Sequence, residues 1–410
     1  MKAYQDASLA PARRAKALLE EMTLAEKVGQ LNQRLYGFRI YERKCVNGED
    51  TIELSEEFCQ EVEKYSGLGV LYGLYRADPW ADKNYETGLT GVLSKKAYNQ
   101  VQRYVLEHSR LGIPVMMSSE CPHGHQALDG YLLPVNLLAG ATFDPAMVRA
   151  AYRVSGRQLQ NMGVDFALMS MLDVLRDPRW GRSEECYSED PYLSARMAEA
   201  AVIGMQESGP EVVAKHFAAQ GEGTGGVNAS AARIGERELR EIHFPPAAAA
   251  IKAGAKGIMA AYNEIDGVYC HANRWLLNDV IRKEMGFDGI VMSDGVAIDQ
   301  LDSMTGDNVV SGALALQSGV DVGLWDEAFG KLEEAVRRGL VKEAQIDQAV
   351  LRVLTLKFER GLFEHPYLEE EGEIHMDYAQ NPESVQLARE GLVILQNKNQ
   401  GLPFWENQAS

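Results

Sequence analysis

The sequence predicts an α/β protein built as a TIM-like (β/α)8 barrel. Short apolar runs alternate with longer helical patterns along most of the 410 residues, at a spacing of roughly thirty to forty-five residues per unit. The runs are apolar throughout, which is typical of parallel strands that helices cover on both faces. Polar or charged residues end most of these runs, and such residues build sites in barrels. A doubly wound open sheet is the alternative, although no GxGxxG motif follows the first run.

Seven apolar runs are the predicted strands. They cover residues 67–74, 113–120, 165–174, 211–217, 257–263, 289–295 and 320–325. The predicted helices include residues 94–110, 144–163, 236–254 and 273–286, and two more within 331–363. Because a parallel strand pair needs a crossover connection, this alternation itself indicates βα units.

The two ends of the chain carry their own patterns. Residues 8–34 indicate two helices, the second beginning at Thr23, where the Thr-Leu-Ala-Glu sequence fits a capping box. Residues 35–65 are polar and are predicted to be an irregular surface segment. Residues 384–404 read as helix, strand and turn, which indicates the entrance to another unit. We therefore expect a barrel domain with N-terminal helices over 1–365, and a linker with the start of a second domain over 366–410.

Composition limits the partners that the protein can bind. The net charge of −18 argues against nucleic acid or an anionic membrane, and favours a neutral or cationic ligand. The five cysteines form no CxxC pair, and their odd number excludes a complete disulfide framework. The N-terminus lacks an apolar signal-peptide core, and no apolar run reaches transmembrane length. The expectation is a cytoplasmic protein without a membrane partner.

Polar residues stand at the carboxyl ends of five consecutive predicted strands. They are Glu120 with His123, Asp173, Lys215 with His216, Tyr262 with Asn263, and Ser293 with Asp294. A single carboxylate there is explained by helix capping, but Lys, His and Tyr do not cap helix starts. The carboxyl ends of barrel strands meet on one face, so these side chains are predicted to form one site.

The set of carboxylates, a Lys-His pair and a Tyr suits a neutral polyhydroxylated ligand, because each hydroxyl of such a ligand both donates and accepts hydrogen bonds. The sequence has no HExxH motif, paired cysteines or P-loop, so neither a metal nor a cofactor is expected. Ser293 lacks the surroundings of a GxSxG nucleophile. Lys215 at a strand end leaves a Schiff-base aldolase open as an alternative.

The chain resembles the family 3 glycoside hydrolases, retaining exo-β-glycosidases that include β-glucosidases and β-xylosidases. The resembling segments follow one another in the family's order along nearly the whole chain. They are LLEEMTLAEKVGQL (18–31), ECPHGH (120–125), LDVLRDPRWGRSEECYSEDP (172–191), KHF (215–217), GIMAAYNEIDGVYCHAN (257–273), VMSDGVAI (291–298), LRVLTLKFERGLFEHPY (351–367) and GLVILQNKNQGLPF (391–404). The last segment resembles the entrance to the family's second domain, an α/β sandwich that is expected to be missing here.

The resemblance implies roles for particular residues. Asp294 matches the nucleophile, which forms a covalent glycosyl-enzyme that water then hydrolyses. The residues implied to bind substrate are Glu120, Arg182, Lys215, His216, Met259 and Tyr262. The loop residues Asp177, Trp180, Glu185 and Asp190, and the histidines His123 and His271, are expected to be structural. The implied partner is a β-linked glucoside or xyloside, and a homo-oligomer is possible.

Three departures from the family's pattern affect these expectations. Gly295 stands where glucosidases usually have Trp, and Trp325 is a candidate for the missing aromatic surface. Glu120 stands where glucosidases usually have Asp, which keeps a β-xylosidase open. No general acid/base is identifiable, since Glu222 is the only carboxylate in the loop 218–233. A sugar-binding barrel without activity is therefore a further alternative.

Overall fold

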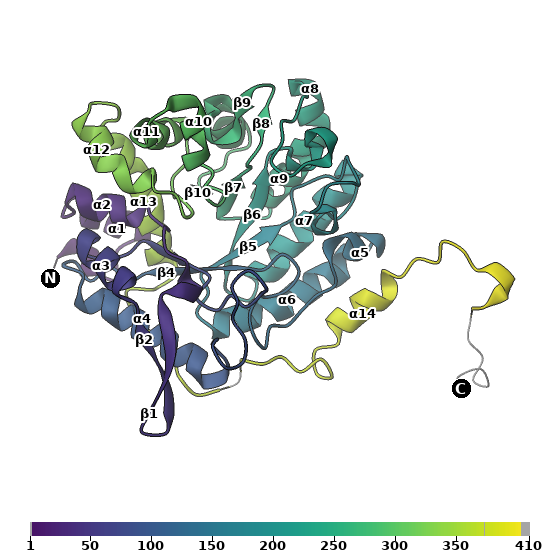
Figure 1. Cartoon of the computed structure of the whole chain (residues 1–410), viewed down its shortest axis with the longest axis horizontal. Helices are drawn as coiled ribbons and strands as arrows, with labels where there is room; N and C mark the ends of the chain where they lie inside the picture. Colours follow the sequence, from purple (N-terminus) through teal and green to yellow (C-terminus); the bar gives the residue numbers. More distant parts are fainter. Residues whose placement is uncertain (1, 373, 403–410) are drawn as a thin grey trace.

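The computed structural model describes residues 2–372 and 374–402, and its centre is a parallel sheet of six strands (Figure 1). In spatial order the strands are β3 (Val70–Tyr72), β4 (Met116–Glu120), β5 (Phe166–Ser170), β6 (Glu211–Phe217), β7 (Gly257–Ala260) and β10 (Ile290–Met292). Every residue of β3, β5, β7 and β10 is buried. This explains why the sequence shows continuous apolar runs, because helices cover the outer face and side chains fill the inside.

Two irregular segments close the sheet into a barrel. The seventh predicted strand, 320–325, forms only one bridge, between Val322 and Met292 of β10. The closing segment beyond it is 31–36, which the sequence assigned mainly to a helix. The backbone amide of Gly323 donates to the carbonyl of Leu31 at 3.0 Å, and Tyr36 bridges to Tyr72 of β3. The barrel prediction is confirmed, with 31–36 as an unpredicted eighth wall segment.

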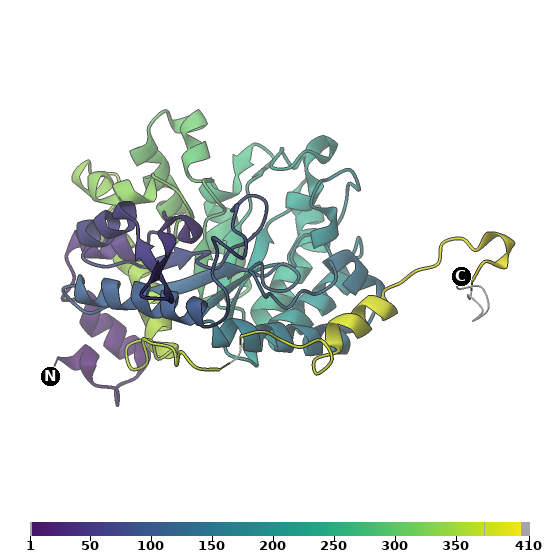
Figure 2. The ribbon, with the colours of Figure 1, turned by 60° about the horizontal axis from the view of Figure 1, so that its bottom comes forward.

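Helices surround the barrel (Figure 2). They are α4 (Gly91–Glu107), α5 (Asn136–Ala141), α6 (Pro145–Asn161), α7 (Pro191–Gln206), α8 (Glu236–Glu238), α9 (Phe244–Lys252), α10 (Asp302–Thr305), α11 (Asn308–Ser318), α12 (Leu332–Arg337) and α13 (Glu343–Glu359). Two predicted α-helices are partly π-helical, over Leu239–His243 and Trp275–Glu284. The first of these precedes Pro245 and Pro246, which cannot donate to the α-helical hydrogen-bond ladder.

The N-terminal helices are α1 (Pro11–Leu19) and α2 (Leu24–Gln30). The capping box at Thr23 is confirmed: its backbone amide donates to Glu26 Oε2 at 2.7 Å, and its Oγ1 accepts from the Glu26 amide at 3.3 Å. Helix α1 packs against α13, so the two ends of the barrel domain support each other.

The prediction of an irregular segment over 35–65 is wrong. Strands β1 (Tyr41–Val46) and β2 (Glu49–Leu54) form an antiparallel hairpin, and helix α3 (Glu56–Tyr65) follows it. The hairpin turns at Asn47 and Gly48, whose φ angles are 54° and 84°. An Asn-Gly pair tolerates these positive φ values and favours a tight two-residue turn. A second, two-residue hairpin, β8 (Glu264–Ile265) and β9 (Val268–Tyr269), lies beside the barrel mouth segment that follows β7.

The C-terminal segment extends away from the barrel (Figure 1). Helix α14 (Glu383–Glu390) confirms the predicted helix and packs against α6. The predicted strand after it is absent from residues 391–396, because no neighbouring strand accepts its backbone hydrogen bonds there. The side chains of Leu392 to Leu395 are 63–93% exposed. Among the described residues, no helix is long and apolar enough to cross a membrane.

Candidate active site

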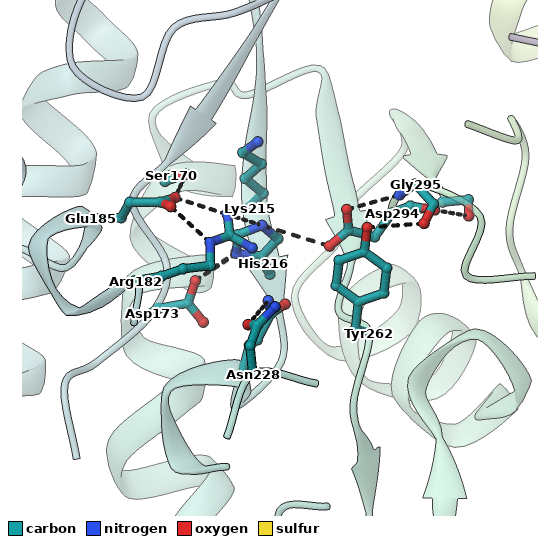
Figure 3. A network of polar contacts seen from close by, with 12 residues as sticks. Ser170, Asp173, Arg182, Glu185, Lys215, His216, Asn228, Tyr262, Asp294 and Gly295 are labelled. Carbon is teal, nitrogen blue, oxygen red and sulfur yellow. Dashed lines mark hydrogen bonds and ion pairs between the residues drawn. The ribbon is translucent and has the colours of Figure 1, made fainter. Parts of the chain in front are cut away.

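Asp294 follows β10 and faces His216 across the candidate site (Figure 3). Its Oδ1 accepts from the backbone amide of Gly295 at 2.8 Å, whereas Oδ2 is buried and has no hydrogen-bond partner among the described residues. The backbone amide of Asp294 donates to Nε2 of His271 at 3.1 Å. Burial lowers the pKa of His271 to about 3, so the ring is neutral and can accept this bond. The backbone is thus fixed while one carboxylate oxygen stays unengaged.

His216 connects Asp294 to the neighbouring strands. Its Nδ1 lies 2.7 Å from Oδ2 of Asp173, and its Nε2 lies 3.6 Å from Oδ2 of Asp294. The guanidinium of Arg182 also reaches Nε2 of His216, at 3.0 Å. Asp173 therefore holds the ring from behind and directs its second nitrogen toward Arg182 and Asp294.

Arg182 is held by a two-point ion pair. Its Nε and Nη2 donate to the two carboxylate oxygens of Glu185 at 2.7 and 2.8 Å, and Ser170 donates to the same carboxylate. Burial opposes ionisation of both groups, but the pairing nevertheless raises the pKa of Arg182 and holds that of Glu185 well below its usual range. The expectation that Glu185 is structural is consistent with this contact, which fixes the plane of the guanidinium.

Lys215 and Glu120 form a second buried ion pair, with Nζ 2.6 Å from Oε2. The Tyr72 hydroxyl donates to the other oxygen of Glu120 at 3.2 Å, and Nη1 of Arg76 lies 4.0 Å from it. Burial acts to raise the pKa of Glu120, but the nearby cations Lys215 and Arg76 hold it below the usual value. The carboxylate is therefore ionised at neutral pH and fixed from three sides.

Two further residues implied by the resemblance lie on and after β7. The hydroxyl of Tyr262 donates to the carbonyl of Gly295 at 2.9 Å, and burial raises its pKa far above the ordinary value, so it remains a neutral donor. Met259 is fully buried beside Met292 of β10, and its role as an apolar wall stays a prediction.

The loop residues hold their own segment together. Asp177 pairs with Arg179 at 2.6 Å, and Asp190 caps α7 by accepting from the Tyr192 amide. The indole of the buried Trp180 donates to Asn228 at 3.0 Å. These contacts agree with their expected structural roles.

Glu222, the only carboxylate of the loop 218–233, is engaged by two basic side chains. Its Oε2 lies 3.3 Å from Nε2 of His243 and 3.2 Å from Nε of Arg176. The proximity of His243 is the first cause, ahead of Arg176, that lowers the pKa of Glu222. A general acid needs the opposite change, so the structure gives Glu222 no support in that role.

The structure brings together Glu120, Lys215, His216, Tyr262 and Asp294, as the strand-end rule predicts, and adds Arg182, which only the resemblance implied. Sequence reasoning missed Tyr72 and Arg76 beside Glu120, and the contact between Asp173 and His216. Tyr72 ends the first strand, so the same rule could have identified it. Arg76 comes from a loop and carries no such signal.

A TIM-like barrel whose mouth holds an unengaged carboxylate oxygen beside fixed cations and hydroxyl donors has the chemistry expected for a polyhydroxylated ligand. Comparison with known proteins agrees, because the Glycosyl hydrolase family 3 N terminal domain matches residues 23–356. The chain belongs to glycoside hydrolase family 3.

Relatives cover both activities that the sequence left open. A beta-xylosidase of Formosa agariphila is 32% identical over an alignment that covers 80% of this chain and 49% of that protein. A periplasmic beta-glucosidase of Salmonella typhimurium is 30% identical over 94% of this chain and 48% of that protein. The chain therefore spans about half the length of the curated relatives it matches.

Solved structures give the same result for the fold. A β-glucosidase from Erythrobacter marinus superposes with a TM-score of 0.86 at 32% identity, over 98% of this chain and 52% of that one. A beta-glucosidase from Listeria innocua gives a TM-score of 0.81 at 29% identity, over 95% of this chain and 53% of that one. The Listeria enzyme has also been solved in complex with glucose, and with isofagomine.

Proposed function

We propose that the chain acts in a retaining exo-β-glycosidase, which hydrolyses terminal non-reducing β-D-glycosyl residues by way of a covalent intermediate on Asp294. One observation carries this proposal: Oδ2 of Asp294 is buried, faces His216 at 3.6 Å, and has no hydrogen-bond partner among the described residues. A carboxylate oxygen that attacks carbon must be free of strong hydrogen bonds and held in place, and the neighbouring backbone contacts hold it.

In the proposed reaction Asp294 attacks the anomeric carbon, the bond to the glycosidic oxygen breaks, and a glycosyl ester forms on the carboxylate. Water then hydrolyses this ester, so the configuration at the anomeric carbon is retained. Arg182, Lys215 and Glu120 would bind the sugar hydroxyls through charge-assisted hydrogen bonds. The group that protonates the leaving oxygen is not assigned to a described residue. The barrel alone is therefore expected to bind sugar but to turn over ordinary glycosides slowly.

Two substrate classes, β-glucosides and β-xylosides, are candidates for the sugar. Relatives named for both activities match the chain at similar identity. We propose a β-glucosidase-like activity because the two solved relatives described above are β-glucosidases. Glu120 favours the alternative, a β-xylosidase, because its side chain is longer than that of the Asp usual in glucosidases. Lys215 and Tyr72 hold this side chain in the site.

The Schiff-base alternative finds no support at Lys215. That chemistry requires a free amine beside a carbonyl, whereas Nζ is engaged by Glu120 at 2.6 Å. Family membership also favours glycoside chemistry. Location in the cytoplasm and homo-oligomer formation stay predictions.

The test uses 2-deoxy-2-fluoro glycosides with an activated leaving group, because these do not need an acid catalyst. Glucosyl and xylosyl reagents are incubated separately with the protein, and the labelled peptide is mapped by mass spectrometry. The expected result is a label on Asp294, absent from the Asp294→Asn variant, and the faster reagent identifies the sugar. Sugar binding without any label would instead support a non-catalytic barrel, and a label on another residue would contradict the mechanism.

A further inference from the structure

Trp325 lies against the residue that follows Asp294. A Cβ atom placed on Gly295 would collide with Cε3 and Cζ3 of the Trp325 ring, and would lie 3.2 Å from the Tyr262 hydroxyl. The indole therefore occupies the space into which a side chain at position 295 would project. Since any residue larger than glycine would displace the ring, Gly295 and Trp325 form one structural unit beside Asp294.

The backbone holds Trp325 in this place from both sides. Its amide donates to the carbonyl of Gln33 at 3.0 Å, and the preceding carbonyl, of Leu324, accepts from the Val296 amide at 2.8 Å. The φ angle of Trp325 is 63°, a left-handed conformation that a bulky residue rarely adopts. Such a conformation persists where the surrounding structure determines it, and it often occurs at ligand sites.

Trp325 belongs to an aromatic cluster that we define as Tyr36, Tyr72, Trp80 and Trp325. The ring of Tyr36 stacks on that of Trp325, with 4.8 Å between the ring centroids. Tyr72 meets the Trp325 ring edge-on, also with 4.8 Å between centroids, and the Trp80 centroid lies 5.2 Å away. Trp325 stays partly exposed, and the Trp80 side chain is 45% exposed. The cluster is thus packed and pre-formed, yet it is not covered.

The aromatic cluster also reaches the opposite end of the site. The hydroxyl of Tyr72 donates to Glu120 at 3.2 Å, and Glu120 pairs with Lys215. Aromatic surface therefore extends from Gly295, whose amide donates to Asp294, to the carboxylate that is proposed to bind sugar hydroxyls. A pyranose fits such a wall, because its C–H groups pack on aromatic rings while its hydroxyls reach polar groups at the edge.

We propose that Trp325 forms the apolar wall of the glycosyl site and contacts the sugar ring itself, and that Gly295 is required to admit it. This inference rests on the proposed function, since it concerns the same site. Trp325 comes from the strand end next to that of Asp294, and not from the position that directly follows Asp294. The ligand class is a neutral or cationic six-membered sugar-like ring.

Titration calorimetry with isofagomine tests the wall, because this compound mimics the sugar ring and carries no leaving group. Trp325→Ala is expected to weaken binding about three- to tenfold, as the loss of one aromatic contact does. Trp325→Phe should retain most of the affinity because it keeps an aromatic ring, and Trp325→Leu should not, although both residues are apolar. Tyr367→Ala, which removes a partly exposed aromatic side chain beyond α13, is the control and should bind as the wild type does.

A double-mutant cycle tests the role of Gly295. Gly295→Ala should weaken isofagomine binding in the wild type but cost nothing further in the Trp325→Ala background, because the collision is then absent. A merely structural role of Trp325 would lower the melting temperature of the variants without this coupling in affinity.

The outcomes separate the two proposals. If the wild type binds isofagomine and Trp325→Ala and Trp325→Leu bind equally well, the wall proposal is overturned and the proposed function stands. If the wild type neither binds isofagomine nor accepts a 2-fluoro glycosyl label, both proposals fail. Additive losses for Gly295→Ala and Trp325→Ala would refute the requirement for glycine.

Discussion

Lys215→Met removes the cation that neutralises Glu120 inside the barrel mouth. The two side chains are 6% and 12% exposed, and their charged atoms lie 2.6 Å apart. Removing one partner of a buried pair leaves an uncompensated charge, which costs about 3–5 kcal/mol. The variant can avoid this cost by protonating Glu120, whose ordinary pKa is 4.5. At pH 7 protonation costs up to about 3.4 kcal/mol, because each pH unit above the pKa contributes about 1.36 kcal/mol.

The pH dependence follows from these directions. In the wild type the pKa of Glu120 is lowered on folding, so its ion pair contributes stability above the unfolded pKa and loses it as pH falls through the folded pKa. In the variant only Arg76 still opposes the effect of burial, so the pKa of Glu120 is higher than in the wild type and protonation restores stability as pH falls. The difference in unfolding free energy between the two proteins should therefore shrink from pH 7 to pH 4.5, by at most about 3 kcal/mol.

Urea unfolding followed by tryptophan fluorescence at both pH values measures this difference. The double variant Lys215→Met with Glu120→Gln is the matched control. The difference between its unfolding free energy and that of the wild type should change much less with pH. A difference for Lys215→Met that is equal at pH 7 and pH 4.5 would refute the reasoning, as would an equally strong pH dependence in the double variant.

Two further predictions concern barrel closure and the support of Arg182. Gly69→Ala should lower the free energy of unfolding by about 1–3 kcal/mol, because the new Cβ would collide with the backbone of Gln30. Gly235→Ala is the control, because a Cβ there meets no atom within 4 Å. Equal melting temperatures for the two variants would contradict this account of closure. Glu185→Gln should destabilise the protein by about 2–4 kcal/mol at pH 7 by breaking the paired contact to Arg182. Since the folded pKa of Glu185 is lowered, this loss should diminish as pH falls below 4.5, and a loss that grows in acid would exclude the ion pair as its cause.

The sequence predicts the strands of this barrel well because burial on both faces leaves continuous apolar runs. Six of the seven runs contain a strand, and their polar ends do converge. The wall segment 31–36 escapes prediction because its sequence, Leu-Asn-Gln-Arg-Leu-Tyr, is mostly polar and follows a helix directly. Backbone hydrogen bonds to Gly323 and Trp325, which lie far away in the chain, define it. The hairpin at Asn47 and Gly48 was predictable, because an Asn-Gly pair favours a tight two-residue turn between strands.

In the candidate site, too, local sequence predicts some features, and contacts between distant residues define the others. Lys215, His216 and Asp294 stand at strand ends, where the sequence itself indicates a site. The pairing of Lys215 with Glu120, rather than with Asp294, depends on where side chains point within the barrel, which spacing does not specify. Likewise, contact between Gly295 and Trp325 joins two strand ends thirty residues apart, and only the folded chain reveals it.

The most direct test of the central claim is chemical rescue of an Asp294→Ala variant by azide, with a 2,4-dinitrophenyl β-glycoside as substrate. The substitution removes the proposed nucleophile, and azide can attack the anomeric carbon in its place while dinitrophenolate leaves without needing a proton. One displacement inverts the configuration, so the account predicts loss of activity without azide and formation of the α-glycosyl azide with it. Undiminished hydrolysis by Asp294→Ala, or a β-glycosyl azide as the product, would contradict the role of Asp294.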